Sequence, residues 1–231
     1  MEYVPPIDLG QMIVNVHPNY VKLLQKLWKK VQDYQKQYGE DDGRVEFFEI
    51  FSMLTVWVLI QFDDFINTHD PLDGKIKKYM TLNAKAKPIM ISQLDTINRA
   101  SFLTKLMFDV EHFFKNILDY FNQNIPNGYG EILDGFLDEL KITDPQTKNI
   151  LKLPADIRNI LHNNGYTRHP IISTTLRNRT YEANAGDQIT FLHWDDIYII
   201  IDEMADCLID IIENNSIINS ETNIPKKPHF I

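Results

Sequence analysis

Residues 101–121, SFLTKLMFDVEHFFKNILDYF, carry the longest helical pattern in this chain. Apolar side chains recur there at steps of three and four residues over about five turns, the spacing of an amphipathic helix that turns one face toward a core. The stripe consists of Phe102, Leu103, Leu106, Met107, Val110, Phe113, Phe114, Ile117, Leu118 and Phe121. A helix of this length and polarity predicts a helical bundle.

Other segments show the same period. A helix is expected over 20–38, with a stripe of Tyr20, Leu24, Leu27, Val31, Tyr34 and Tyr38 that ends before Gly39. The segment 47–65 is apolar on most faces, so we expect it to be buried nearly all round at the centre of the bundle. A short helix over 131–140 follows. The last helix should open at Trp194, with Ile197, Ile200, Ile201, Met204, Leu208, Ile211 and Ile212 facing the core.

Proline and glycine mark the remaining boundaries. Pro154 is poorly tolerated inside a helix, so we expect it in the first turn of a helix that runs to about His162 and ends before Gly165. Strand signals follow at 171–175, 180–183 and 188–192, and Ala185-Gly186-Asp187 is a candidate hairpin turn between the last two.

These elements predict a mainly α fold, a helical bundle with one small β-hairpin before the last helix. No linker divides the chain, so we expect one domain over 1–218 and a loosely held polar tail over 219–231.

Composition restricts the class of protein. The chain has 231 residues, 44% of them hydrophobic and 24% charged, as in soluble globular proteins. Cys207 is the one cysteine, which excludes an internal disulfide, and its place in an apolar stripe indicates an inert core thiol. The longest uncharged apolar run, 50–62, is shorter than the roughly 18 residues of a spanning helix, and residues 1–14 do not resemble a secretion signal. A cytoplasmic location is therefore expected.

Charge is unevenly distributed along the chain. The formal net charge of −9 argues against a protein that coats nucleic acid with its whole surface. Within 151–179, however, five basic residues stand against one acid, whereas 180–215 contains nine acids and no Lys or Arg. A second basic stretch, 74–87, holds five lysines and is expected to be a solvated surface loop. The first basic segment predicts local contact with nucleic acid through Arg168, His169, Arg177 and Arg179.

The most informative residues lie in PADIRNILHNNG, 154–165. On a helix, Arg158 and His162 stand at i and i+4 and share a face within reach of one phosphate-sized group. An Arg guanidinium binds phosphate through its planar fork, and His can move a proton near neutral pH. A structural interpretation stays open, in which Arg158 pairs with a carboxylate of the last helix and His162 caps its own helix.

Here the chain resembles the HEPN superfamily of bacterial helical-bundle proteins. The resemblance lies in the pair Arg158-Asn159, the following His162-Asn163-x-Gly165 at the end of a late helix, the hairpin and the acidic last helix, and it covers about 92–214. Catalytic members separate their Arg and His by four to six residues. Only three residues intervene here, and this shorter interval favours a binding role over a catalytic one.

The resemblance implies a metal-independent endoribonuclease whose composite site forms across a homodimer, in phage defence or with an antitoxin or nucleotidyltransferase partner. His162 would move the proton, Arg158 would stabilise charge on the phosphate and Asn159 would orient one of them. The alternative is a non-catalytic module that binds nucleotide, RNA or a partner protein. We expect the homodimer to pair through the helix that carries Arg158, because an exposed Ile160 or Leu161 would need covering.

No cofactor or metal is predicted, because the chain contains no Gly-rich phosphate loop and no zinc-protease motif. Asp109, His112 and Asn116 share the outer face of the long helix and could hold a metal, but a solvated face is the favoured interpretation.

Overall fold

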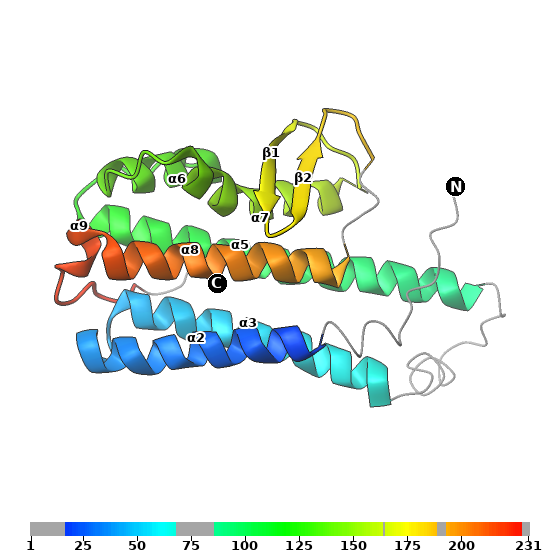
Figure 1. Ribbon diagram of the computed structural model, residues 1–231, viewed down its shortest axis with the longest axis horizontal. Coiled ribbons are helices and arrows are strands. Elements are labelled where there is room, and N and C mark those ends of the chain that lie inside the picture. The colour runs from blue at the N-terminus through cyan, green and yellow to red at the C-terminus, as the bar shows by residue number, and fades with distance from the viewer. Residues whose placement is uncertain (1–16, 68–85, 164, 189–192, 228–231) are drawn as a thin grey trace.

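A computed structural model describes residues 17–67, 86–163, 165–188 and 193–227 of the chain. These described residues form seven helices and one two-stranded antiparallel hairpin, which confirms a mainly α bundle with a small hairpin before the last long helix (Figure 1). The helices are α2 (His17–Tyr38), α3 (Gly43–Asn67), α5 (Ala86–Tyr120), α6 (Tyr129–Glu139), α7 (Pro145–His162), α8 (Trp194–Asn214) and α9 (Ser216–Asn219), and the strands are β1 (Ile171–Leu176) and β2 (Arg179–Ala183).

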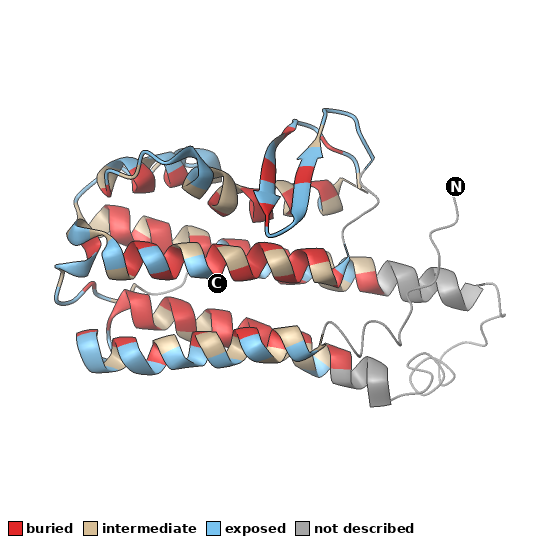
Figure 2. Ribbon diagram, viewed as in Figure 1, coloured by how far each residue is buried: buried red, intermediate tan, exposed pale blue. Residues whose placement is uncertain are grey.

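The four long helices α2, α3, α5 and α8 run along the longest axis of the molecule, with α6, α7 and the hairpin on one side (Figure 1). α3 packs against both α2 and α5, and α5 also contacts α6 and α7. Buried residues concentrate along α3 and α8, whereas the hairpin presents many exposed residues (Figure 2). α7, which carries the candidate site, packs against α5 and α8 of this bundle.

The long apolar stripe of α5 lies in the core as predicted. Nine of its ten residues are buried and Phe121 is half-buried. The ring of Phe113 stacks on Phe47 of α3 at 4.7 Å, and that of Phe114 stacks on Phe136 of α6 at 4.1 Å. Such pairs contribute about 0.5–1.5 kcal/mol each beyond the area they bury. All seven stripe residues of α8 are also buried.

The prediction that 47–65 is buried nearly all round is wrong. Met53, Val56 and Ile60 lie on one face of α3 and are exposed, Met53 by 63%. Among the described side chains, α3 is covered where it meets α2 and α5 and, at its first residues, by the tail. One segment of this helix, 43–62, has the length and composition of a membrane span, with half of its most apolar window buried inside the fold, a property that core helices of soluble proteins share.

Pro154 does not begin a helix. α7 starts at Pro145, and the Asp144 carboxylate caps it by accepting hydrogen bonds from the backbone N–H groups of Gln146 and Thr147. Pro154 lies within α7, and its ring is buried in the fold. The carbonyl of Leu151, in the turn that the proline interrupts, also accepts a hydrogen bond from the Tyr129 hydroxyl at 2.7 Å, so an outside donor supports that turn.

The hairpin turn lies earlier in the chain than predicted, at residues 177–178 and not at 185–187. β1 pairs with β2 across the two residues Arg177 and Asn178, and Arg177 has a positive φ of 49°. The turn at 184–187 instead bonds to the loop before β1, because Gly186 N–H donates to Thr167 O and Thr167 N–H to Asp187 O. Gln188 forms a bridge with Tyr166, and the predicted strand beyond it, 189–192, lies outside the described residues, as does most of the lysine stretch 74–87.

The tail is not loosely held over residues 219–227. Ile224 is fully buried, and its N–H donates to the Asp42 carboxylate while its carbonyl accepts from Gly43 N–H. A Cβ on Gly43 would lie 2.5 Å from the Asn116 amide nitrogen, so this close approach requires glycine. The last four residues of the predicted tail, 228–231, lie outside the described residues.

The tail also covers the face of α5 that was expected to be solvated. Asn116 donates to Pro225 O at 3.0 Å, and His112 Nε2 lies 3.2 Å from Lys227 O. Asp109 and Asn116 are buried. The set Asp109, His112 and Asn116 is therefore part of a packed contact between α5 and the tail.

Arg44 and Asp42 form a fully buried ion pair beneath the tail. The Arg44 guanidinium donates to both oxygens of Asp42 at 2.8 and 2.7 Å, and to the carbonyls of Ile218 and Glu221. Its carbon atom lies 3.3 Å above the centre of the Tyr38 ring. The pair thereby connects the α2–α3 turn to α9 and the residues after it.

Candidate functional site on helix α7

The C-terminal half of α7 is anchored through one face and open on another. Ile157 and Ile160 are buried in the core, and Leu161 packs against it half-buried. Arg158 and His162 stand on the open face beside a hollow of about 660 Å³ between α7, α5 and the loop before β1. The reason given for a homodimer through this helix is therefore wrong, because neither Ile160 nor Leu161 is an exposed apolar side chain.

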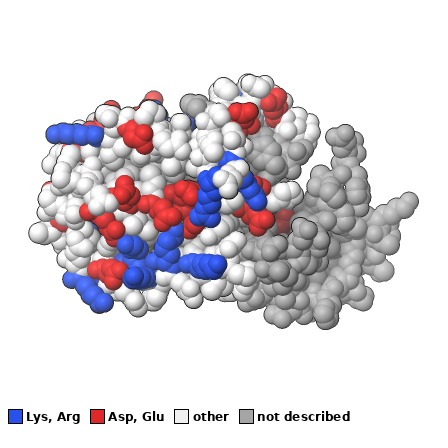
Figure 3. All heavy atoms as spheres, viewed as in Figure 1, with Lys and Arg blue, Asp and Glu red and all other residues white. Residues whose placement is uncertain are grey.

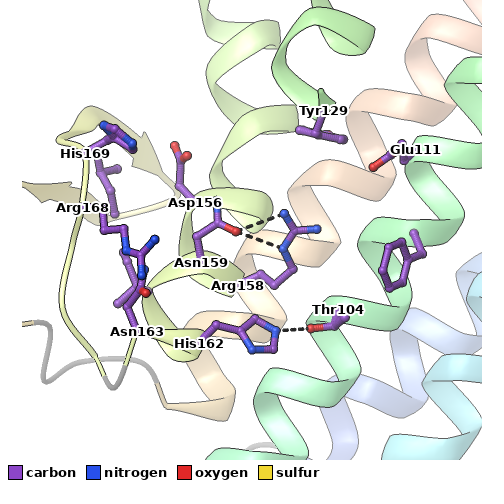
Figure 4. A pocket seen from close by; sticks show the side chains of 13 residues that line it. Thr104, Glu111, Tyr129, Asp156, Arg158, Asn159, His162, Asn163, Arg168 and His169 are labelled. Carbon is purple, nitrogen blue, oxygen red and sulfur yellow. Dashed lines mark hydrogen bonds between the residues drawn. The ribbon is translucent and has the colours of Figure 1, made fainter. Parts of the chain in front are cut away.

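Arg158 reaches from α7 toward α5 (Figure 4). Its Nε and Nη2 atoms donate to the side-chain oxygen of Asn159 at 3.3 and 3.1 Å. Within the described part of the chain, no carboxylate forms an ion pair with it, so the expected structural pairing with the last helix is not seen. A guanidinium held by a neutral amide keeps its remaining N–H groups available for an anion.

The carboxylates that line the same hollow have lysine partners of their own. Glu111 pairs with Lys115 at 2.7 Å, and Asp156 with Lys152 at 3.4 Å. Burial raises the pKa of the Asp156 carboxyl above its ordinary value, and the charge of Lys152 opposes this shift. Both acids are thus paired with lysines, although the charge of Arg158 also acts on the Asp156 carboxyl.

His162 is held by a contact that sequence reasoning missed. Its Nε2 atom lies 2.8 Å from the hydroxyl of Thr104 on α5 (Figure 4). The helix is capped instead by Asn163, whose N–H donates to the carbonyls of Asn159 and Ile160. The imidazole is exposed, and its Nδ1 atom is the ring nitrogen left for a ligand. No local spacing could indicate Thr104, since it lies 58 residues earlier.

Arg168 and His169 line the same hollow from its other side. Figure 4 shows them on the loop that follows α7, beyond Asn159, whereas Arg158 and His162 point toward α5. Both are exposed, and no described acid forms an ion pair with Arg168. The structure thus brings five of the seven predicted site residues to one hollow. They come from α7 and the loop that follows it, and they are Arg158, Asn159, His162, Arg168 and His169.

The other two predicted site residues, Arg177 and Arg179, do not line this hollow. Arg177 pairs with Asp202 and with Glu203 at 2.9 Å, and Arg179 pairs with Asp196 at 2.6 Å. The Asp196 hydrogen bond raises the pKa of Arg179 above its ordinary value. Figure 3 shows the row of acids on α8 with basic side chains on both sides of it. These arginines fasten the hairpin to α8.

Replacing both hairpin arginines with alanine should therefore weaken folding and spare binding. The double variant Arg177→Ala/Arg179→Ala removes one guanidinium partner from each of the nearly buried Asp196 and Asp202, which costs about 1–3 kcal/mol, although Lys26 still pairs with Asp202. Urea unfolding followed by circular dichroism measures this loss. The matched variant Arg168→Ala should unfold like the wild type and bind RNA more weakly. Weaker RNA binding by the hairpin variant at unchanged stability would contradict this assignment.

Cys207 lies half-buried against the core in α8, and burial raises the pKa of its thiol to about 12. A thiol with so high a pKa is a poor nucleophile at neutral pH, in accord with the structural role predicted for it.

The hollow combines an arginine that forms no ion pair with any acid in the described part of the chain, an exposed histidine and neighbouring amides. This combination can hold a phosphate group and exchange a proton with it or with a hydroxyl beside it. No family model, no curated protein and no solved structure matches this chain.

Proposed function

We propose that this chain is a HEPN-like RNA-directed protein, a metal-independent endoribonuclease acting through Arg158, Asn159 and His162 in a cytoplasmic defence or toxin–antitoxin setting. The observation that carries the proposal is the juxtaposition on α7: among the described residues the Arg158 guanidinium hydrogen-bonds to Asn159 alone, and His162 is exposed on the same face. The chemical resemblance of 158–165 to the HEPN motif supports it.

In this mechanism the RNA supplies its own nucleophile. The 2′-hydroxyl oxygen attacks the adjacent phosphorus, the bond from phosphorus to the 5′-oxygen breaks, and the products end in a 2′,3′-cyclic phosphate and a 5′-hydroxyl. One group removes the 2′-hydroxyl proton and one gives a proton to the departing oxygen. Arg158 stabilises the charge on the phosphate oxygens, and Asn159 orients the guanidinium.

The two proton transfers favour a homodimer. Each chain offers one histidine on the arginine face of α7, so a second copy of His162 supplies the second group in a composite site. An antitoxin or a nucleotidyltransferase is the other proposed type of partner.

A second candidate function rests on the same geometry. Three residues separate Arg158 and His162, and the Nε2 atom of His162 is already hydrogen-bonded to Thr104. A histidine fixed in this way suits recognition of a phosphate. The alternative is therefore a non-catalytic module that binds nucleotide, RNA or a protein at this helix end.

RNA cleavage with and without a chelator distinguishes these functions. The purified chain is incubated with total RNA and with defined oligoribonucleotides, and the ends are characterised. The endoribonuclease should give 2′,3′-cyclic phosphate or 3′-phosphate ends at the same rate in EDTA. RNA that is bound but never cut would support the binding module, and neither binding nor cutting would refute both.

Binding should respond to salt as expected for a few local contacts. Two phosphate contacts, one to Arg158 and one to Arg168, predict a slope of about −1.4 in a plot of log affinity against log salt for single strands. Arg158→Ala should reduce the slope by about 0.7. Fluorescence anisotropy of a labelled oligonucleotide measures both. A slope unchanged by the substitution would show that Arg158 does not contact phosphate.

A further inference from the structure

Phe108 is a large aromatic side chain that the fold leaves open to solvent. It is 60% exposed, although its neighbours Met107 and Val110 on α5 are fully buried. It lines two hollows, the one beside Arg158 and His162 and a groove of about 1100 Å³ between α3 and α5. An exposed phenylalanine at the edge of a polar site requires a reason, because burying such a ring is favourable.

The position of Phe108 relative to the phosphate-binding residues is set by the helix. Thr104, which bonds His162, precedes it by four residues, and Glu111 follows by three, so all three share one face of α5. Side chains at i and i+4 are separated by about 5–6 Å between Cβ atoms. The Phe108 side chain therefore leaves α5 about 5–6 Å from that of Thr104, which contacts His162.

The groups around the ring are those of a site for single-stranded nucleic acid. Arg158 lies in one hollow, and Lys105, in the other, is exposed and without an ion-pair partner among the described residues. Cationic side chains beside an aromatic platform hold the phosphate and the base of one nucleotide together.

We propose that Phe108 forms a nucleobase-binding subsite, in which the base next to the phosphate held by Arg158 stacks on its ring. The inference rests on the proposed function and adds a recognition element that the 158–162 motif does not contain. The ring has no hydrogen-bonding group, so the subsite accepts any base, and larger purines should stack more strongly.

The test compares two probes on the full chain. One is a labelled 2′-O-methyl oligoadenylate, which cannot be cleaved, and the other is an abasic oligomer of equal length. Wild-type protein should bind the first about tenfold more tightly. Phe108→Ala should abolish that difference by weakening binding of the oligoadenylate alone, and Phe108→Trp should retain it. Arg158→Ala should weaken binding of both probes.

Ile97→Ala is the matched control, because Ile97 is a 57% exposed apolar side chain of the same helix that lines neither hollow. It should bind both probes like the wild type. If the wild type binds neither probe, the proposed function fails. If it binds both probes equally, or if Phe108→Ala binds like the wild type, the subsite is refuted and the phosphate site stands. If Phe108→Ala instead lowers the mass measured by light scattering, the ring belongs to a protein contact, which also overturns the proposal.

Discussion

Replacing His162 with alanine should abolish RNA cleavage while leaving the fold intact. Loss of a general acid–base group typically slows a reaction by about 10²–10⁴-fold, and a composite site loses the group from both copies at once. The side chain is exposed and contributes to no buried stripe, so the melting temperature should match that of the wild type. Single-turnover cleavage of a labelled oligoribonucleotide measures the effect.

Two controls separate chemistry from binding in this variant. Added imidazole should restore part of the activity of His162→Ala, since it replaces the lost group, whereas it should have no effect on Arg158→Ala. Lys36→Ala, at the far end of α2, should cleave at the wild-type rate. Cleavage by His162→Ala at more than a tenth of the wild-type rate would rule out the acid–base role. Unfolding of the variant would mean that the Thr104 contact is primarily structural.

Replacing Asp42 with alanine should produce the largest loss of stability. Asp42 and Arg44 are both fully buried, and the substitution leaves the guanidinium without its carboxylate. Removing one partner of a buried pair costs about 3–5 kcal/mol, a large share of the 5–15 kcal/mol of a whole domain. It also removes the acceptor for Ile224 N–H. Urea unfolding should show a lower midpoint.

Lys148→Ala provides the comparison, because Lys148 pairs with Asp134 on the surface, where both side chains are about half-exposed. Exposed pairs contribute about 0–1 kcal/mol, so this variant should unfold close to the wild type. The double variant Asp42→Ala/Arg44→Met removes the buried charge as well and should recover part of the lost stability. A loss below about 1 kcal/mol for Asp42→Ala would show that water reaches Arg44.

The long helices could be predicted because the apolar spacing that identifies each of them lies within its own segment of the sequence. Three- and four-residue spacing identified the buried faces of α5 and α8, and the stripe of α2 differs from the prediction only in that Leu23 is buried and Leu24 half-buried. Periodicity shows which face of a helix is apolar. It does not show how many neighbours are available to cover that face, and for this reason Val56 and Ile60 of α3 were wrongly placed inside.

The hairpin and the tail depended on partners that are distant in the sequence. Ala185-Gly186-Asp187 has the composition of a hairpin turn, but its hydrogen bonds go to Thr167, and a turn of Arg177 and Asn178 has no compositional signal for the conformation it adopts. The sequence Asp42-Gly43-Arg44 likewise resembles an exposed polar turn. Its burial follows only from Ile218, Glu221 and Ile224, which supply the matching groups.

The residues of the candidate site likewise fall into two groups, those that local spacing could predict and those that depend on partners distant in the sequence. Arg158, Asn159 and His162 are close in sequence on one helix, so their shared placement could be predicted from spacing alone. Thr104 and Phe108 come from α5 and are ordinary residues of a helix until α7 lies against them. The basic character of 151–179 predicted binding for all its arginines, but it could not show that the acids of α8 already occupy two of them.

The buried ion pair also sets an order of events during synthesis. The carbonyl that Arg44 needs at Ile218 lies 174 residues later, and the N–H that Asp42 accepts at Ile224 lies 182 residues later. At roughly 5–20 residues per second, a ribosome takes on the order of ten seconds or longer to make that segment. Until then Arg44 can pair with Asp42 but not with the later carbonyls, so we expect the α2–α3 end of the bundle to close only after α8 and α9 have left the ribosome.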